Sequence, residues 1–248
     1  MIVRLGDGET ITDLDRRNVV ILAARPELTI TWSRYAAGEP GPDLHVHREH
    51  TDAFYVLEGE LTFAVGPAAK RVTVAAGGYV SVPPNVAHSF RNDSSADARW
   101  LNFHAPEQGF AAYLRAARDG TDAAFDSFDP PADGGLPADG VVVAGPGEGE
   151  RLGPGGLLKG DLRDLDVGEW VLDGIDRHQR HGREDAYYVL DGEIELAVER
   201  TVHVVGEDTL ACVARGVRHR LVHTGSGNAR VLSVLVPGTR VADAVHAG

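Results

Sequence analysis

The chain has 248 residues and is 43% apolar, which allows one large or two small domains and is ample for a packed core. Its formal net charge of −13 argues against nucleic acid as a partner, because phosphates require a basic footprint. Its single cysteine, Cys212, excludes an intramolecular disulfide and a cysteine-based zinc site, so any metal must be held by histidine and carboxylate side chains.

The N-terminal residues 1–8 mix Arg4 and Asp7 into a short apolar run. They lack the succession of basic, apolar and small residues that marks a signal peptide, and we therefore expect a cytoplasmic protein. No later segment approaches the roughly 20 consecutive apolar residues that a membrane-spanning helix needs, so we expect no membrane partner.

Short runs rich in Val, Tyr, Phe, Thr and Leu alternate with Gly, Pro and Asn, a pattern typical of all-β domains. Gly59 separates two of these runs and can supply the positive φ of a tight hairpin turn. The segment Pro83-Pro84-Asn85 marks a corner between strands, because proline cannot donate to a strand ladder. In the first half of the chain the runs predict strands at residues 28–34, 53–58, 60–65, 71–74, 79–82, 88–92 and 99–104.

Residues 107–118 show the one convincing helical pattern, with apolar side chains at i, i+1, i+4 and i+7. We expect this short helix to close one domain and to pack against the next. The following segment is rich in Asp, Gly, Pro and Ala, as linkers are. The predicted organisation is an N-terminal domain at 1–118, a linker at 119–139 and a C-terminal domain at 140–248.

The two halves of the chain repeat one sequence. Residues 54–65, FYVLEGELTFAV, nearly coincide with residues 187–198, YYVLDGEIELAV. A long period that occurs twice indicates a duplicated domain, because solenoid repeats are shorter and recur three or more times. We therefore expect two similar all-β domains in tandem.

Histidines cluster in the first half. His45 and His47 are separated by one residue, so on a strand both side chains project from the same face. Asp52 follows five residues after His47, and His88 begins a later predicted strand. His50 and its neighbour Glu49 lie off this register, and we expect both to be solvated loop residues.

Around these histidines the sequence resembles the cupin superfamily, whose two motifs read G-x5-H-x-H-x(3–4)-E-x6-G and G-x5-P-x-G-x2-H-x3-N. Asp52 stands where the family has Glu, and Glu39 stands at the first Gly, flanked by Gly38 and Gly41. Asn85 replaces another Gly, which is tolerable because Asn accepts left-handed backbone geometry. The residues that match both motifs at the correct spacing are His45, His47, His88, Gly59, Gly77, Pro83 and Asn92.

The resemblance implies an all-β chain of two tandem jelly-roll barrels, joined by the short helix and the linker, with a metal inside the first barrel. Imidazoles and a carboxylate suit Mn, Fe(II), Co, Ni, Cu or Zn. We predict one divalent transition metal in this barrel. Asp52 is either a ligand or a general base that acts on bound substrate. The predicted metal site is His45, His47, Asp52 and His88.

The second half has lost part of this pattern, because the repeat places Arg180 at the position of His47. A guanidinium cannot ligate a cation. We therefore expect a metal-free second barrel in which Arg180 pairs with Asp185. The alternative is a repaired metal site in which a bulge turns His181 inward. That site would comprise His178, His181, Asp185 and His219.

The first-half text HVHREHTDAFYVLEGELTF is similar to bacterial quercetin 2,3-dioxygenase-like cupins. This resemblance implies a metal-dependent dioxygenase that acts on a small aromatic or enolic metabolite and on dioxygen, with Asp52 taking the substrate's proton. Aromatic side chains could line a pocket for a planar substrate, although core packing is the simpler role for each. These candidates are Phe54, Phe63, Phe90 and Phe103.

Fold and family do not determine the reaction, and two alternatives stay open. One is a non-oxidative isomerase or cyclase that uses the metal as a Lewis acid. The other is a metal-stabilised binding or sensor module without turnover, which a pocket plugged by side chains would favour. Barrels of this kind often pair through their sheet edges, so we expect either a homodimer or two halves of one chain that cover each other's sheet edges.

Overall fold

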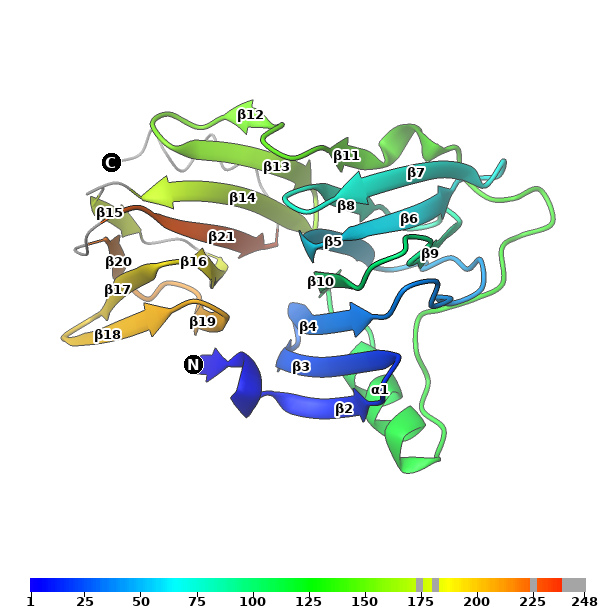
Figure 1. The fold of residues 1–248 in the computed structure, drawn as a ribbon, viewed down its shortest axis with the longest axis horizontal. Coiled ribbons are helices and arrows are strands. Elements are labelled where there is room, and N and C mark those ends of the chain that lie inside the picture. The colour runs from blue at the N-terminus through cyan, green and yellow to red at the C-terminus, as the bar shows by residue number, and fades with distance from the viewer. Residues whose placement is uncertain (173–175, 180–182, 224–226, 238–248) are drawn as a thin grey trace. The chain divides into compact units, whose positions relative to one another are not determined.

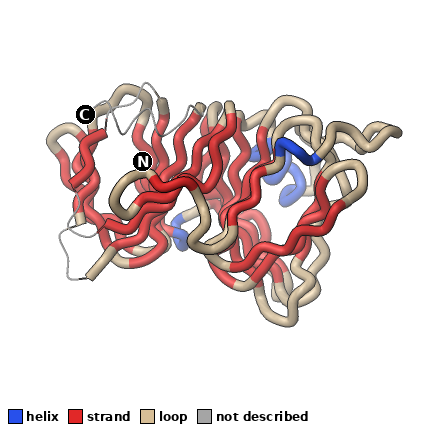
Figure 2. Tube along the Cα trace, turned by 90° about the horizontal axis from the view of Figure 1, so that it is seen from above, coloured by secondary structure: helices blue, strands red, loops and turns tan. Residues whose placement is uncertain are grey.

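The computed structural model describes residues 1–172, 176–179, 183–223 and 227–237. Strands dominate the trace (Figure 2). The chain divides into two compact units, which we name by their main segments. The N-terminal unit is Gly8–Glu148, and the C-terminal unit combines Met1–Asp7 with Gly149–Gly248. The prediction of two all-β domains in tandem is confirmed.

The N-terminal unit contains a seven-stranded sheet in the order β11-β8-β5-β10-β4-β3-β2 and a three-stranded sheet in the order β7-β6-β9 (Figure 1). All pairs within these sheets are antiparallel. The strands are β2 (Glu9–Asp13), β3 (Arg17–Arg25), β4 (Leu28–Tyr35), β5 (Thr51–Glu58), β6 (Glu60–Val65), β7 (Lys70–Ala75), β8 (Tyr79–Val82), β9 (His88–Arg91), β10 (Ala98–Ala105) and β11 (Val142–Ala144).

The C-terminal unit repeats this plan, with a seven-stranded sheet β1-β19-β16-β21-β14-β13-β12 and a four-stranded sheet β15-β20-β17-β18. Its edge strand β1 comes from the start of the chain, and Val3 pairs with Leu210 of β19. The strands are β1 (Ile2–Arg4), β12 (Glu150–Arg151), β13 (Gly156–Leu162), β14 (Leu165–Leu172), β15 (Asp176–Gln179), β16 (Glu184–Asp191), β17 (Glu193–Val198), β18 (Thr201–Gly206), β19 (Thr209–Val213), β20 (His219–Val222) and β21 (Ala229–Val236).

The predicted helix is α1 (Phe110–Asp119), and 3-10 turns occur at η1 (Leu5–Asp7) and η2 (Ala138–Gly140). The Glu107 carboxylate accepts hydrogen bonds from two N–H groups of the first turn, and Gly120 ends the helix in a left-handed conformation. The apolar side of α1 packs on Ile11 and Ile21 of its own unit. Within the described part of the chain, no helix is long and apolar enough to cross a membrane.

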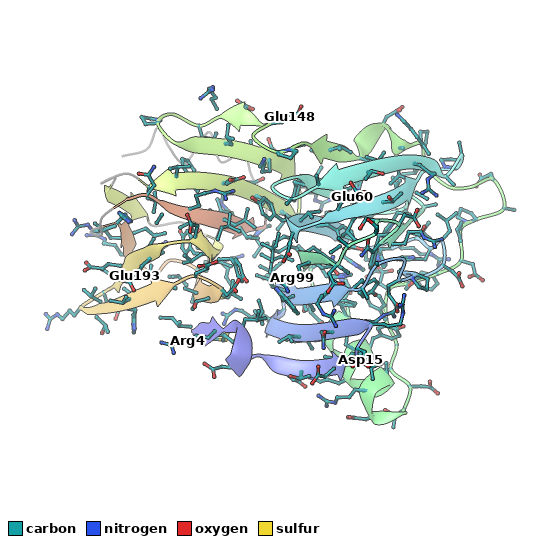
Figure 3. All side chains as sticks on the ribbon, viewed as in Figure 1. Arg4, Asp15, Glu60, Arg99, Glu148 and Glu193 are labelled. Carbon is teal, nitrogen blue, oxygen red and sulfur yellow. The ribbon has the colours of Figure 1, made fainter. Side chains whose placement is uncertain are left out.

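The core of the N-terminal unit lies between its two sheets. Phe54, Phe63 and Trp100 are almost fully buried there and pack with aliphatic side chains of β6, β7 and β8. Burial of one such aromatic side chain stabilises the fold by roughly 1.5–3 kcal/mol. Charged side chains such as Glu60 and Arg99 are exposed on the outside of this unit (Figure 3).

At three positions in and beside the two motifs, the backbone geometry explains the residue type. Gly59 has φ +71°, and a Cβ there would lie 2.3 Å from the Asp97 carbonyl oxygen. Asn85 has φ +67°, so it adopts the left-handed geometry that the replacement of Gly required. A Cβ on Gly41 would lie 1.6 Å from the Phe90 carbonyl oxygen. The glycine that is offset from the motif therefore permits a close backbone approach.

Candidate metal centre

The four predicted metal residues converge at one end of the N-terminal barrel. His45 pairs with His88 in an isolated antiparallel bridge, in which each main-chain N–H donates to the other residue's carbonyl at 3.0 and 2.8 Å. His47 follows in the same segment, and Asp52 is the second residue of β5. One potential ligand atom from each of the four residues lies within 4.8 Å of the others. His45 is half-buried, and the other three are buried.

The three imidazole rings are oriented in the same way. The Nδ1 atom of each ring contacts a main-chain carbonyl oxygen, which can only accept, so Nδ1 donates. In the neutral ring, Nε2 then carries the free lone pair. The pairs are His45 with Asp43 at 2.8 Å, His47 with Asp126, and His88 with Val86 at 3.0 Å.

Asp52 faces these lone pairs. Its Oδ2 atom lies 3.2 Å from His88 Nε2 and 3.6 Å from His47 Nε2. His47 Nε2 is buried without a hydrogen-bond partner in the structure. Nitrogen lone pairs and a carboxylate oxygen that face one another are unfavourable unless a cation lies between them. The donor set therefore fits a divalent transition metal.

The ionisation states agree with this fit. Burial, with His88 adding to it, lowers the pKa of His45 to about 4. A carboxylate and neutral imidazoles are the forms that bind a metal.

Two further histidines belong to this region, and the expectation that His50 is a solvated loop residue is wrong. His50 is 0% exposed, and its Nε2 shares a hydrogen bond of 2.8 Å with Nδ1 of His104. His104, at the end of β10, is also buried. Burial is the main cause that lowers the pKa of both rings, to about 4 for His50.

His50 faces inward because residues 48–50 form a turn rather than a strand, so alternation does not apply from His47 onward. The sequence signal that could have found it is the spacing to Asp52, because His50 lies directly before β5 (Thr51–Glu58) and two residues before Asp52. Ring nitrogens of His47, His50 and His104 also lie within 4.8 Å of one another, which makes these three a second group of potential ligands that shares His47.

A cavity of about 760 Å³ opens onto the centre. Its polar lining includes His45, His47, Asp52, Asn102 and His104. The remaining wall combines aromatic side chains with aliphatic and charged ones, and it includes side chains from α1 and from the segment that follows it. These aromatic residues are Tyr35, Phe90, Trp100, Phe110, Tyr113, Phe125 and Phe128.

Of the four phenylalanines predicted for the pocket, the structure places Phe90 in the cavity wall. Phe54 and Phe63 belong to the barrel core, where they pack against Phe90. Phe103 is fully buried and absent from the cavity wall, because on β10 it alternates with Asn102 and His104, which face the cavity. Sequence reasoning missed the wall contributed by α1.

In the C-terminal unit, His219 has a different partner. Its Nδ1 donates to the Val217 carbonyl oxygen at 3.0 Å, and its Nε2 accepts from the Tyr187 hydroxyl at 2.7 Å. Tyr187 occupies the repeat position of Phe54, and His219 occupies that of His88. The hydroxyl that Tyr187 adds therefore binds the Nε2 lone pair of His219, whereas the Nε2 lone pair of His88 faces Asp52. Asp185 Oδ2 lies 3.5 Å from His219 Nε2.

Among the described residues of this unit, no group of three potential ligands comes together. Arg180 and His181 lie outside the described residues, and His178 is described only through the pairing of β15 with β20. The expected pairing of Arg180 with Asp185 and the alternative metal site therefore both stay predictions.

Asp185 should make the stability of the C-terminal unit depend on pH. Burial raises its pKa to about 8; Arg183 opposes this shift and Glu184 adds to it, while His219 lies nearby. Because the folded pKa exceeds the unfolded value, the native state binds more protons between about pH 4 and 8, and stability falls as pH rises through that range. We expect Asp185→Asn to raise the free energy of unfolding at pH 8 by a few kcal/mol, on the order of 1.4 kcal/mol per pKa unit, and by much less at pH 5.

Urea unfolding of both proteins at pH 5 and pH 8, with metal removed by chelation, measures this difference. An equal pH dependence in the two proteins would show that Asp185 is ionised in the folded state across the range.

Comparison with known proteins gives the family. The cupin domain model matches residues 31–104 and 167–235, more than half of the chain. The chain belongs to the cupin family. One matched segment lies in each unit, so the prediction of a bicupin with two jelly-roll domains is confirmed.

This bicupin is similar to quercetin 2,3-dioxygenase of Bacillus subtilis (strain 168), with 27% identity over 96 residues. The alignment covers 38% of this chain and 28% of the length of that enzyme. Among solved structures, it resembles the protein Ylba from E. coli, with TM-score 0.69, 12% identity and coverage of 96% of this chain and 91% of the other. It also resembles oxalate decarboxylase from Bacillus subtilis, with TM-score 0.68, 14% identity and coverage of 96% and 76%. At these identities the structural likeness shows the fold alone.

Proposed function

We propose that this bicupin holds one divalent transition metal in its N-terminal unit and acts as a dioxygenase on a small aromatic or enolic molecule. The observation that carries the proposal is the convergence of His45, His47, His88 and Asp52, with Nε2 lone pairs facing a carboxylate, beside a cavity with aromatic side chains in its wall. When bound, the metal would supply Lewis acidity and open positions for the oxygen atoms of the substrate.

The side chains around the site would each have a separate task. The three imidazoles would hold the metal through Nε2, because Nδ1 is committed to main-chain carbonyl oxygens. Asp52 is the fourth ligand in this proposal, since Oδ2 points toward the imidazole nitrogens while Oδ1 accepts from Asn102 Nδ2 at 2.5 Å. A substrate hydroxyl bound beside Asp52 would pass its proton to this carboxylate.

The cavity favours a flat, apolar substrate with one polar edge. Tyr35 and Trp100 pack edge to face at 4.7 Å on one part of the wall, and Tyr113 stacks on Phe125 at 5.2 Å on another. Such surfaces bind planar rings well, and the polar lining comprises the groups of the metal centre together with further side chains such as Arg17 and Arg118. The weak similarity to a quercetin dioxygenase supports the same substrate class.

The test is oxygen-dependent turnover. Protein loaded separately with Fe(II), Mn(II), Ni(II) or Co(II) is mixed with flavonol and 1,3-diketone substrates, and dissolved oxygen is followed with an electrode. We expect at least one metal form to consume oxygen in equal amounts with substrate, and ¹⁸O₂ to label the product with two oxygen atoms. Turnover of the same substrates without oxygen would replace this proposal by the isomerase or cyclase alternative. Tight binding without turnover in any form would favour the binding module.

A further inference from the structure

Asp126 lies in the segment predicted to be a linker, yet it contacts the metal centre through two separate groups. Its main-chain carbonyl oxygen accepts from His47 Nδ1. Its carboxylate accepts from the main-chain N–H groups of Arg48, at 3.0 and 3.1 Å, and Glu49, at 2.8 Å, and from His50 Nδ1 at 2.8 Å. The Asp126 side chain is 8% exposed. One residue outside the cupin motifs therefore binds the whole turn at residues 47–50.

The segment that carries Asp126 is itself tied to the barrel. Val46 and Phe128 form an antiparallel bridge, with N–H to carbonyl distances of 2.9 and 3.0 Å. The ring of Phe125 packs against His47 at 5.3 Å and His50 at 5.5 Å between ring centroids. Asp126 is thus held between two anchored residues, Phe125 and Phe128.

A chain of buried hydrogen bonds leads from Asp126 to Asp52. Beyond the bond from His50 to Asp126, His50 Nε2 and His104 Nδ1 share a hydrogen bond of 2.8 Å, and His104 Nε2 lies 3.0 Å from Asn102 Oδ1. The orientation of the Asn102 amide follows from its other end, where Nδ2 donates to Asp52 Oδ1 at 2.5 Å and to the Ala53 carbonyl oxygen at 3.0 Å. These hydrogen bonds occupy Oδ1 of Asp52, and Oδ2 of Asp52 faces His88 and His47.

We infer that Asp126 is a positioning residue of the metal centre: it orients His47 directly, and it orients Asp52 through His50, His104 and Asn102. The inference rests on the proposed metal site. Partners that orient metal ligands typically change metal affinity about 10–100-fold when they are removed. Asp126 would exert this effect from both sides of the site at once.

The experiment measures Co(II) affinity by competition with a chelator and records the visible absorption of the Co(II) protein, which reports the number and geometry of its ligands. Asp126→Ala removes all carboxylate contacts, and we expect affinity to fall about 10–100-fold, with a changed spectrum. Asp126→Asn can keep an oxygen at the place of Oδ2, which serves Arg48, Glu49 and His50, but it puts an NH2 group against the Arg48 N–H and removes the negative charge beside His50. We expect a smaller loss of affinity and a changed spectrum. Asp122→Ala, an exposed aspartate in the same segment, is the control and should match wild type.

The outcomes separate this inference from the proposed function. Wild-type protein that binds no Co(II) contradicts the metal site itself. Wild-type binding together with an unchanged affinity and spectrum in the Asp126→Asn protein overturns the inference. If Asp126→Ala fails to fold, Asp126→Asn still decides, because its main-chain contacts are preserved. Urea unfolding of the metal-free variants shows whether a lost affinity merely follows lost stability.

Discussion

Replacement of His88 by alanine should leave the protein with almost no bound metal. His88 is 1% exposed, its Nδ1 is held by the Val86 carbonyl oxygen, and its Nε2 lies nearest to Asp52 Oδ2. No other ring replaces this nitrogen at the same place, and loss of a direct ligand should cost at least the roughly 100-fold that loss of an outer partner can cost. The variant should still fold, because the bridge between residues 45 and 88 uses main-chain atoms.

Elemental analysis of purified protein after dialysis checks this expectation. Wild-type protein should hold about one metal ion per chain and the His88→Ala protein close to none. Glu60→Gln is a suitable control, because Glu60 is an exposed carboxylate on the outer surface (Figure 3) and should leave the metal content unchanged. Retention of the metal in His88→Ala would contradict the ligand assignment. About two ions per wild-type chain would contradict the expectation of a metal-free C-terminal unit, or would place a second ion in the group that shares His47.

The short sequence motifs predicted the four proposed metal residues, but they did not predict the contacts that Asp126 makes with the turn at residues 47–50 from far along the chain. His45, His47, Asp52 and His88 were found because the spacing within two short motifs reflects a bridge and a strand start. The contacts of Asp126 could not be predicted, because its carboxylate binds Arg48, Glu49 and His50. These residues precede it in the chain by 78, 77 and 76 positions. A segment rich in Asp, Gly and Pro carries no periodic signal that would reveal such a long-range anchor.

For the fold, too, elements with a local sequence pattern were predicted, and elements that depend on distant partners were not. Strands with alternating or continuous apolar residues were predicted closely, as at β6 (Glu60–Val65) and β8 (Tyr79–Val82), because burial imposes their pattern. Strand β1 (Ile2–Arg4) was not predicted, because three residues are too short to show a period. Its pairing with β19 depends on a partner more than 200 residues away. The aromatic cavity wall from α1 was missed for a related reason, since a helix pattern does not show what its face covers.

Asp52→Asn should stabilise the metal-free protein and should lose most or all of this advantage when metal is present. In the metal-free protein, Asp52 Oδ2 faces the lone pairs of His88 and His47, and His47 Nε2 has no hydrogen-bond partner in the structure. An asparagine can keep the bond from Asn102 through its oxygen and donate its N–H to one of these nitrogens. We expect the free energy of unfolding of the metal-free variant to rise by about 1–3 kcal/mol, the usual cost of a buried polar group left unpaired.

With metal present the advantage of the Asp52→Asn protein should be offset, because the variant binds the metal more weakly. A ligand that binds the native state stabilises it by RT ln(1 + [L]/Kd), so an affinity weakened about 100-fold removes roughly 2.7 kcal/mol of that stabilisation at saturating metal. Urea unfolding at pH 7.5 of wild-type, Asp52→Asn and Asp52→Glu proteins, each with chelator and with excess Co(II), measures both effects. Asp52→Glu restores the carboxylate of the family motif and should retain the metal-dependent gain. If Asp52→Asn instead keeps the full gain while turnover is lost, Asp52 acts as a base that stands back from the metal, because a neutral amide cannot replace a charged ligand at equal affinity.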